Sequence, residues 1–328
     1  MLKQLIISLM IIYSANSFAL ADCWKIDDAD ERLTCYDNSM NTDQAPSPHH
    51  DSTETSTTEA PVEFDIDTAS YSGIINFFDE QKLFRLSPHE PSYILPAAYN
   101  SKPNEDIWQQ IKPGSEIDEM EVKFQISAKI KFWDDLYKDN WDLWFGYTQT
   151  AWWQLYNADA SAPFRETNYS PEIFASYYSN INILGFTLLE TDIGFRHQSN
   201  GRAELLSRSW NRIYANFQLE KGNFLLWLQP WYRIPEDADD DDNPDIHKYM
   251  GYGNFRLIYK NEGHLYSILL RNNLASDNKG AVELSWAFPL YDTVKIYLQY
   301  YNGYGESLID YDHDVNRISL GILLYDWI

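Results

Sequence analysis

The sequence predicts an all-β protein, a single antiparallel transmembrane β-barrel of about 12 strands. Several segments alternate between an apolar row and a row of polar or small side chains, with no helical period. Aromatic residues make up 16% of the chain, with 24 Tyr and 12 Trp, which suits the aromatic girdles of a membrane barrel. A soluble β-sandwich gives the same alternation, so the alternation alone does not distinguish it from a membrane barrel. The aromatic content and an export signal favour the barrel.

The N-terminus has the pattern of a secretory signal peptide. Lys3 precedes an apolar run from Leu5 to Tyr13, and Ala19-Leu20-Ala21 forms a small-x-small cleavage pattern before Asp22. The run is shorter than the roughly 20 apolar residues that a membrane helix needs. We therefore expect residues 1–21 to be removed on export.

Residues 22–63 are predicted to form a periplasmic extension outside the barrel. Its two cysteines, Cys23 and Cys35, would pair in an oxidising compartment, and two free thiols are the alternative. From Asn38 to Pro61 the sequence is rich in Ser, Thr, Asp and Pro with almost nothing apolar, which is typical of a disordered linker. The barrel domain is expected over residues 64–328.

The alternation is clearest in four segments of this domain. Counting all candidate segments gives about 12 strands, an even number as bacterial barrels require, and 10 is the alternative. The apolar and opposite rows are Val122, Phe124 and Ile126 against Lys123, Gln125 and Ser127; Val282, Leu284, Trp286 and Phe288 against Ala281, Glu283, Ser285 and Ala287; Val294, Ile296, Leu298 and Tyr300 against Lys295, Tyr297, Gln299 and Tyr301; and Ile318, Leu320, Ile322 and Leu324 against Arg317, Ser319, Gly321 and Leu323.

Three polar side chains interrupt apolar rows between Gly194 and Tyr214. His197 and Ser199 are two residues apart, so on a strand they point to the same side, and the preceding members of that row are apolar. Asn211 lies in an apolar row of what we expect to be the next strand. In a soluble protein such a face is the core, whereas in a membrane barrel it touches lipid. A possible Ser, His and amide hydrolytic triad would therefore face the bilayer.

The charge of the chain restricts its partners. The formal net charge of −24 argues against nucleic acid as a partner. It fits a surface that gathers divalent cations between itself and anionic lipid. The acidic run from Asp237 to Asp245 would most often be a solvated loop that attracts such cations by charge alone.

Five long stretches resemble the outer membrane phospholipase A family of bacteria, and they keep the same order. The resemblance covers roughly Phe84 to the C-terminus and leaves the cysteine segment and the linker outside. It implies a multi-pass protein of the bacterial outer membrane that hydrolyses acyl esters of membrane glycerophospholipids, with phospholipase A1/A2 and lysophospholipase activity. The stretches are SAPFRETNYSPE (Ser161 to Glu172), GFRHQSNGR (Gly194 to Arg202), SRSWNRIY (Ser207 to Tyr214), DDNPDIHKYMGY (Asp241 to Tyr252) and YNGYGESLIDY (Tyr301 to Tyr311).

The resemblance also implies a role for individual residues. Ser199 matches the nucleophile, His197 the general base and Asn211 the residue that orients the histidine. The backbone N–H of Gly201 matches the oxyanion donor. Oxygen ligands suit Ca²⁺, and the active form is a homodimer while the resting form is a monomer. The matching calcium ligands are the Arg202 carbonyl, the Ser207 side chain, Ser161 from a second subunit, and Asp242 in a second calcium arrangement.

The main alternative is a catalytically silent outer-membrane barrel, either a small porin or a scaffold. It would keep the export signal and the alternation but would need no Ser, His and Asn on one face. A second alternative, a phospholipase that has lost activity, is disfavoured because all three triad positions are occupied. Inward polar residues that could fill the barrel and leave no channel are Arg212, Glu283, Lys295, Gln299 and Arg317.

Overall fold

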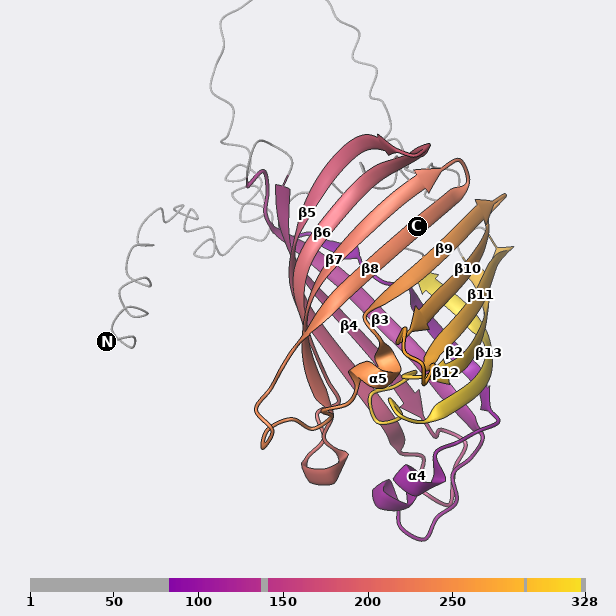
Figure 1. Cartoon of the computed structure of the whole chain (residues 1–328). Coiled ribbons are helices and arrows are strands. Elements are labelled where there is room, and N and C mark those ends of the chain that lie inside the picture. The colour runs from indigo at the N-terminus through magenta and orange to yellow at the C-terminus, as the bar shows by residue number, and fades with distance from the viewer. Residues whose placement is uncertain (1–82, 137–140, 292–293, 326–328) are drawn as a thin grey trace, which may run out of the picture. The chain divides into compact units, whose positions relative to one another are not determined.

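The structure is a computed structural model that describes residues 83–136, 141–291 and 294–325, and these form a closed antiparallel barrel (Figure 1). Strands β2 (Ser92–Asn100) to β13 (Asp314–Tyr325) follow one another in chain order, and pairing of β2 with β13 closes the ring. The short β1 (Leu86–Pro88) pairs with β3 (Met120–Trp133) beyond the end of β2, so it prolongs the line of β2. The predicted fold class and the strand number of 12 are confirmed.

The predicted signal peptide, the cysteine pair and the linker lie outside the described residues. Among the residues that the structure describes, no helix is long and apolar enough to cross a membrane. The twelve barrel strands are β2 (Ser92–Asn100), β3 (Met120–Trp133), β4 (Trp141–Trp153), β5 (Phe164–Ile183), β6 (Phe186–Ser199), β7 (Ser209–Lys221), β8 (Phe224–Ile234), β9 (Gly253–Asn261), β10 (His264–Asn272), β11 (Gly280–Tyr291), β12 (Val294–Tyr304) and β13 (Asp314–Tyr325).

The two ends of the barrel differ in the length of their connections. Two-residue turns join β5 to β6 and β9 to β10, and in each both residues have positive φ: 54° and 84° at Leu184 and Gly185, 52° and 77° at Glu262 and Gly263. Such turns match the twist of the flanking strands. The other end carries the long connections, with α4 (Glu105–Ile111) and α5 (His247–Met250) among them (Figure 1). Outer-membrane barrels have short periplasmic turns and long extracellular loops, so this second end is the extracellular one.

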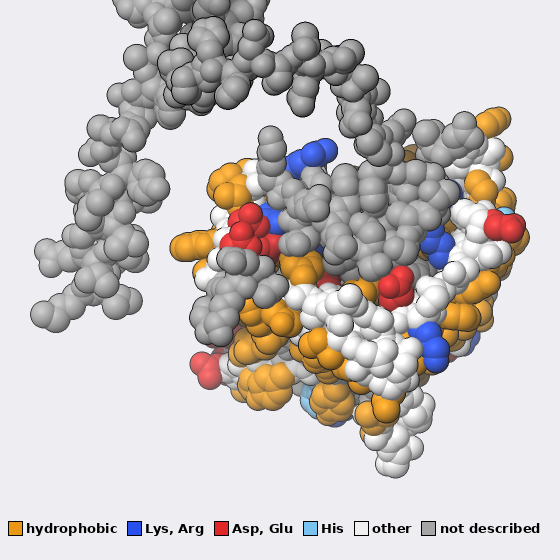
Figure 2. Space-filling view, turned by 90° about the horizontal axis from the view of Figure 1, so that it is seen from above, with side chains coloured by type: hydrophobic (Ala, Val, Ile, Leu, Met, Phe, Trp, Pro, Cys, Tyr) orange, Lys and Arg blue, Asp and Glu red, His pale blue; other side chains and the backbone are white. Residues whose placement is uncertain are grey.

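The strand faces follow the predicted alternation. Ile126, Ile318 and Leu320 project outward and are about half exposed, at 56%, 51% and 49%, whereas Arg317 and Ser319 project inward and are buried. Seen from the short-turn end, hydrophobic side chains gather along much of the visible outer edge of the described barrel (Figure 2). An exposed apolar wall of this extent is stable in contact with lipid rather than water.

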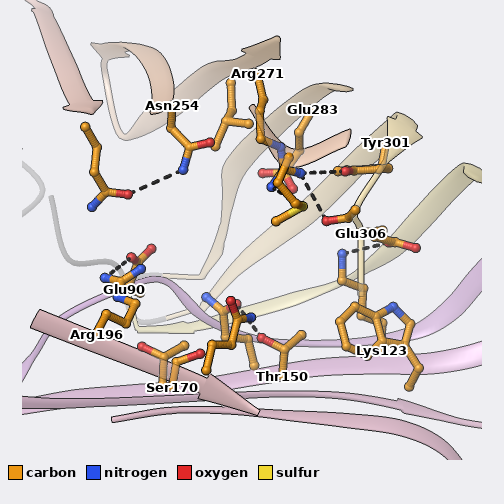
Figure 3. A pocket seen from close by; sticks show the side chains of 18 of the residues that line it. Glu90, Lys123, Thr150, Ser170, Arg196, Asn254, Arg271, Glu283, Tyr301 and Glu306 are labelled. Atoms are coloured by element: carbon orange, nitrogen blue, oxygen red, sulfur yellow. Dashed lines mark hydrogen bonds and ion pairs between the residues drawn. The ribbon is translucent and has the colours of Figure 1, made fainter. Parts of the chain in front are cut away.

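The interior is filled by side chains. Next to the short turns an apolar cluster includes Leu189, Leu225 and Leu323. Beyond it, charged residues pair inside the barrel: Lys123 Nζ lies 3.0 Å from Glu306 Oε1, and Glu306 Oε2 accepts from Arg317 Nε at 2.9 Å. A polar cavity of about 190 Å³ remains between these groups (Figure 3). This polar filling agrees with the predicted closed interior.

Candidate active site

The three triad candidates lie on the outer wall at the extracellular end. Ser199 is the last residue of β6, and the β6–β7 register pairs His197 with Asn211. Residues at two-residue spacing before them, Ile193 on β6 and Ile213 on β7, project outward and are 52% and 49% exposed. His197, Ser199 and Asn211 therefore continue lipid-facing rows, as the sequence predicted. Each of the three is half-buried.

The histidine and the asparagine are in direct contact. His197 Nδ1 and Asn211 Oδ1 are 2.9 Å apart, and Asn211 Nδ2 donates to Glu236 Oε1 at 2.7 Å. Because the amide N–H₂ is directed to the carboxylate, its oxygen faces the ring, so His197 Nδ1 is the donor. His197 Nε2 is then the nitrogen that can accept a proton. Within the described residues, the Ser199 hydroxyl makes no hydrogen bond to His197, which is common before substrate binds.

The connection from β6 to β7 is shaped by one buried side chain. Asn200 Oδ1 accepts from the backbone N–H of Arg202 at 3.2 Å and of Arg208 at 3.0 Å, and Asn200 Nδ2 donates to the Leu206 carbonyl at 2.8 Å. Gly201 follows with φ of +66°, and a Cβ there would lie 3.2 Å from the Tyr169 ring. The conformation thus favours glycine beside the nucleophile.

The inward residues behind the triad hold β6 and β7 together. Gln198, between His197 and Ser199 in the sequence, accepts from Trp210 Nε1 at 2.9 Å and from Arg212 Nη2 at 3.0 Å. The Arg212 guanidinium lies 3.8 Å from the centre of the Trp210 ring. These contacts restrict both strands on the side away from lipid, so they limit movement of the outward side chains.

The predicted calcium ligands are brought together only in part. Ser207 Oγ donates to Asp242 Oδ2 at 2.6 Å, which joins the β6–β7 and β8–β9 connections. The Arg202 side chain turns inward to Glu166, with Nε 3.2 Å from Oε2, and its backbone stays in the same connection as Ser207. Ser161 is exposed in the β4–β5 connection with φ of +65°. Within the described part of the chain, no hydrogen bond links Ser161 to the other three.

Two groups near the triad were missed by the sequence analysis. One is Glu236, whose only sequence signal is its place two residues after the strand opposite Asn211. The other is Glu172, which is fully buried on β5 and accepts from Arg196 Nη2 at 2.8 and 2.9 Å. The sequence pattern gave no partner for either acid, because both partnerships depend on the register between strands.

The fold and this site define a class of protein, a transmembrane β-barrel with a serine, histidine and amide on its lipid-facing wall. Comparison with known proteins agrees with that class. The sequence model of the Phospholipase A1 family matches residues 77–324. The Phospholipase A1 of Klebsiella pneumoniae is 39% identical over 248 residues, which cover 76% of this chain and 85% of the relative. That of Escherichia coli K12 is 38% identical over 243 residues, which cover 74% and 82%.

Solved structures are similar over the whole of their own length. The outer membrane phospholipase dimer of Salmonella typhi with bound calcium has a TM-score of 0.74 and 36% identity, covering 79% of this chain and 100% of that chain. Outer membrane phospholipase A of Escherichia coli gives 0.71 and 37%, covering 75% and 100%. Its form with an active-site asparagine replaced by alanine gives 0.74 and 35%, covering 79% and 100%.

This chain belongs to the phospholipase A1 family. It is therefore a phospholipid ester hydrolase, and its closed barrel places it in the bacterial outer membrane. The predicted family and location are confirmed, and the passive porin is the poorer interpretation. The roles of the individual site residues stay predictions.

Proposed function

We propose that the chain is a calcium-dependent phospholipase A1/A2 and lysophospholipase that acts on bilayer lipid through Ser199, His197 and Asn211. The observation that carries this proposal is the 2.9 Å contact between His197 Nδ1 and Asn211 Oδ1 on outward strand faces. It orients the imidazole with Nε2 available to Ser199, one outward position further along β6. The Escherichia coli structure with an altered active-site asparagine supports an amide in this place.

The chemistry follows from these roles. Ser199 Oγ attacks the ester carbonyl of a glycerophospholipid while His197 Nε2 takes its proton. The protonated His197 then gives that proton to the departing glycerol oxygen, which leaves an acyl group on Ser199. A water molecule, deprotonated by His197, then attacks the acyl-serine, and His197 returns that proton to Ser199 Oγ as the fatty acid leaves. The backbone N–H of Gly201 is the proposed donor to the oxyanion of each tetrahedral intermediate.

The residues present suit a calcium ion. The Ser207 hydroxyl and the Arg202 carbonyl, with Asp242 as a further ligand in a second calcium arrangement, offer only oxygen atoms, which Ca²⁺ prefers. Ser207 Oγ and Asp242 Oδ2 are already 2.6 Å apart. The Salmonella typhi dimer with bound calcium supports the assignment. Bound there, the ion would supply positive charge beside the developing oxyanion, which is worth several kcal/mol in metal-assisted catalysis.

A dimer is the proposed active form, and a monomer the resting form. One barrel presents Ser199 on a convex wall that cannot enclose an acyl chain. A second barrel against this wall would form a groove and would bring Ser161 of the partner subunit to Ser207 and Arg202. An enzyme within a bilayer of its own substrate needs such control, because a site always complete would degrade the membrane. The dimeric Salmonella typhi structure supports this arrangement.

The test is hydrolysis of a phospholipid in detergent micelles, with and without a calcium chelator, alongside cross-linking. We expect the chelator to remove activity and added calcium to restore it. Specific activity should rise with the protein-to-detergent ratio in step with the cross-linked dimer, and a sulfonylating serine reagent should stabilise that dimer. Full turnover in the presence of chelator would overturn the calcium role, and full turnover by monomers would overturn the dimer.

A further inference from the structure

Asn211 lies between two partners, and only one of them belongs to the proposed triad. Its Oδ1 faces His197 Nδ1 at 2.9 Å, and its Nδ2 donates to Glu236 Oε1 at 2.7 Å. A continuous line of hydrogen-bonded side chains therefore leads from the histidine through the amide to a carboxylate. The line ends at the only group in it that carries a fixed negative charge.

Glu236 reaches this position from a third element. β8 ends at Ile234, which pairs with Asn211 in the β7–β8 register, and Glu236 follows two residues later. Residues two apart on an extended chain share a side, so Glu236 continues the outward row to the level of the triad. Pro235 between them has no N–H to donate, which suits a position where the hydrogen bonds between β7 and β8 end. Glu236 is half-buried there.

The carboxylate decides which way the asparagine amide points. An amide can present either its oxygen or its N–H₂ group to the imidazole, and an ionised carboxylate only accepts hydrogen bonds. Glu236 therefore selects the orientation in which the N–H₂ faces it and the oxygen faces His197. That orientation makes His197 Nδ1 the donor and leaves Nε2 as the acceptor that a general base requires.

Glu236 also changes the charge around the imidazole. A neutral asparagine stabilises an imidazolium less than the aspartate of the usual triad does. Donation from Asn211 Nδ2 to an anion polarises the amide, which makes its oxygen a stronger acceptor. The negative charge itself attracts the imidazolium that forms during catalysis. Because the neighbouring lipid has a low dielectric constant, this attraction is screened less than it would be in water.

We propose that Glu236 is a positioning residue. It fixes the orientation of the Asn211 amide and, through Asn211, supplies the negative charge that a triad with a neutral asparagine lacks. This inference rests on the proposed function, because it requires His197 to be the general base. Glu236 does not touch the substrate in this scheme. It acts only through Asn211.

The experiment compares Glu236→Gln with Asp237→Asn in the full chain, in calcium-containing micelles. Gln keeps the shape of Glu but is neutral, and Asp237 is an exposed neighbour in which the same charge is lost. For Glu236→Gln we expect kcat and the rate of Ser199 sulfonylation to fall about ten-fold, a loss typical of one charged hydrogen bond, with KM and the half-maximal calcium concentration unchanged. Asp237→Asn should stay within about two-fold of wild type, as surface changes usually do.

A double variant separates this role from a merely structural one. Asn211→Asp alone places two carboxylates together, so we expect a larger loss than for Glu236→Gln. In Asn211→Asp with Glu236→Gln, the glutamine amide can donate to the new aspartate, and kcat should recover to above that of Asn211→Asp alone. A double variant no more active than Asn211→Asp would overturn the proposal. So would a Glu236→Gln variant that matches Asp237→Asn or changes only the calcium requirement.

Ser199→Ala in the same assay distinguishes failure of this inference from failure of the proposed function. If Ser199→Ala keeps activity, the triad itself is wrong. If Ser199→Ala is inactive and Glu236→Gln behaves as wild type, the triad stands and Glu236 has no part in it.

Discussion

The two faces of the barrel wall beside β6 hold polar side chains under opposite conditions. Inward, Glu172 is fully buried and its two carboxylate oxygens accept from His89, Arg196 and Tyr214. Gly194 leaves room for this cluster, because a Cβ there would lie 2.7 Å from the Tyr214 ring. Both oxygens of the acid are hydrogen-bonded. The polar groups of the inner face therefore hold neighbouring strands together.

Outward, the polar groups are few and incompletely bonded. Within the part of the chain that the structure describes, His197 is hydrogen-bonded through Nδ1 alone, and Ser199 has no hydrogen bond to it. Apolar neighbours such as Phe195 and Ile213 surround them. Polar groups on a lipid-facing wall are costly unless they serve a purpose. The difference indicates that the inner polar residues stabilise the barrel while the outer ones perform its chemistry, a division that mutations can test.

The largest expected effect is on the outer face. Ser199→Ala should lower hydrolysis by a thousand-fold or more, on the order seen when a serine nucleophile is removed, because no other group can form the acyl-enzyme. The barrel should be unaffected, since only one half-buried hydroxyl is lost. Ester hydrolysis in micelles and heat-modifiable migration on a gel measure the two outcomes. Altered migration would show that Ser199 also supports the fold.

The inner face should respond in the opposite way. Glu172→Ala removes the buried carboxylate that pairs with Arg196 and leaves that guanidinium only the more distant Glu90, 3.5 Å away. Breaking a buried ion pair costs about 3–5 kcal/mol of unfolding free energy. Denaturant unfolding in micelles measures this loss, with Glu220→Ala as a control at a partly exposed site near the turns. Equal stability of the two variants would contradict the division between faces.

A pH dependence should also belong to the interior. Burial raises the pKa of Glu306, but Arg317 and Lys123 outweigh burial and hold it at about 2. A folded pKa below the unfolded one gives stability that is present above about pH 4.5 and is lost as pH falls toward 2, in total about 3 kcal/mol. The free energy of unfolding of wild type should therefore exceed that of Glu306→Gln at neutral pH, and this difference should shrink as the pH falls across that range. Unfolding curves at pH 6 and pH 3 compare the two, and a constant difference would exclude this role.

The smallest expected effect concerns calcium at the outer site. Ser207→Asn replaces a hydroxyl that donates to Asp242 with a larger amide, so the half-maximal calcium concentration should rise by about ten-fold, the change that one ligand or its partner typically causes. Unfolding should be unchanged because Ser207 lies in a connection outside the strands. A calcium titration of hydrolysis measures the shift. An unchanged requirement would remove Ser207 from the ligand set.

Much of this architecture is readable from the sequence because a strand has a period of two. Alternation places Ile318 and Leu320 on one side and Arg317 and Ser319 on the other, and the structure confirms that division. The same parity places Ser199 and His197 on the outer wall. Long motifs that resemble a known family supplied the roles, and the family is confirmed. These properties are local, so each follows from a short stretch of chain.

Only the tertiary structure decides which distant residues meet. The contact between Asn211 and Glu236 depends on the β7–β8 register, and the bond between Ser207 and Asp242 depends on two extracellular connections that lie 35 residues apart in the chain. The polar interior is of the same kind, since Lys123 on β3 and Glu306 in the β12–β13 connection come together only when β2 pairs with β13 and closes the ring. Alternation assigns a side chain to a face, but it carries no information on pairing between strands or loops. The physical reason is that parity is a property of one strand, whereas register and closure belong to the whole barrel.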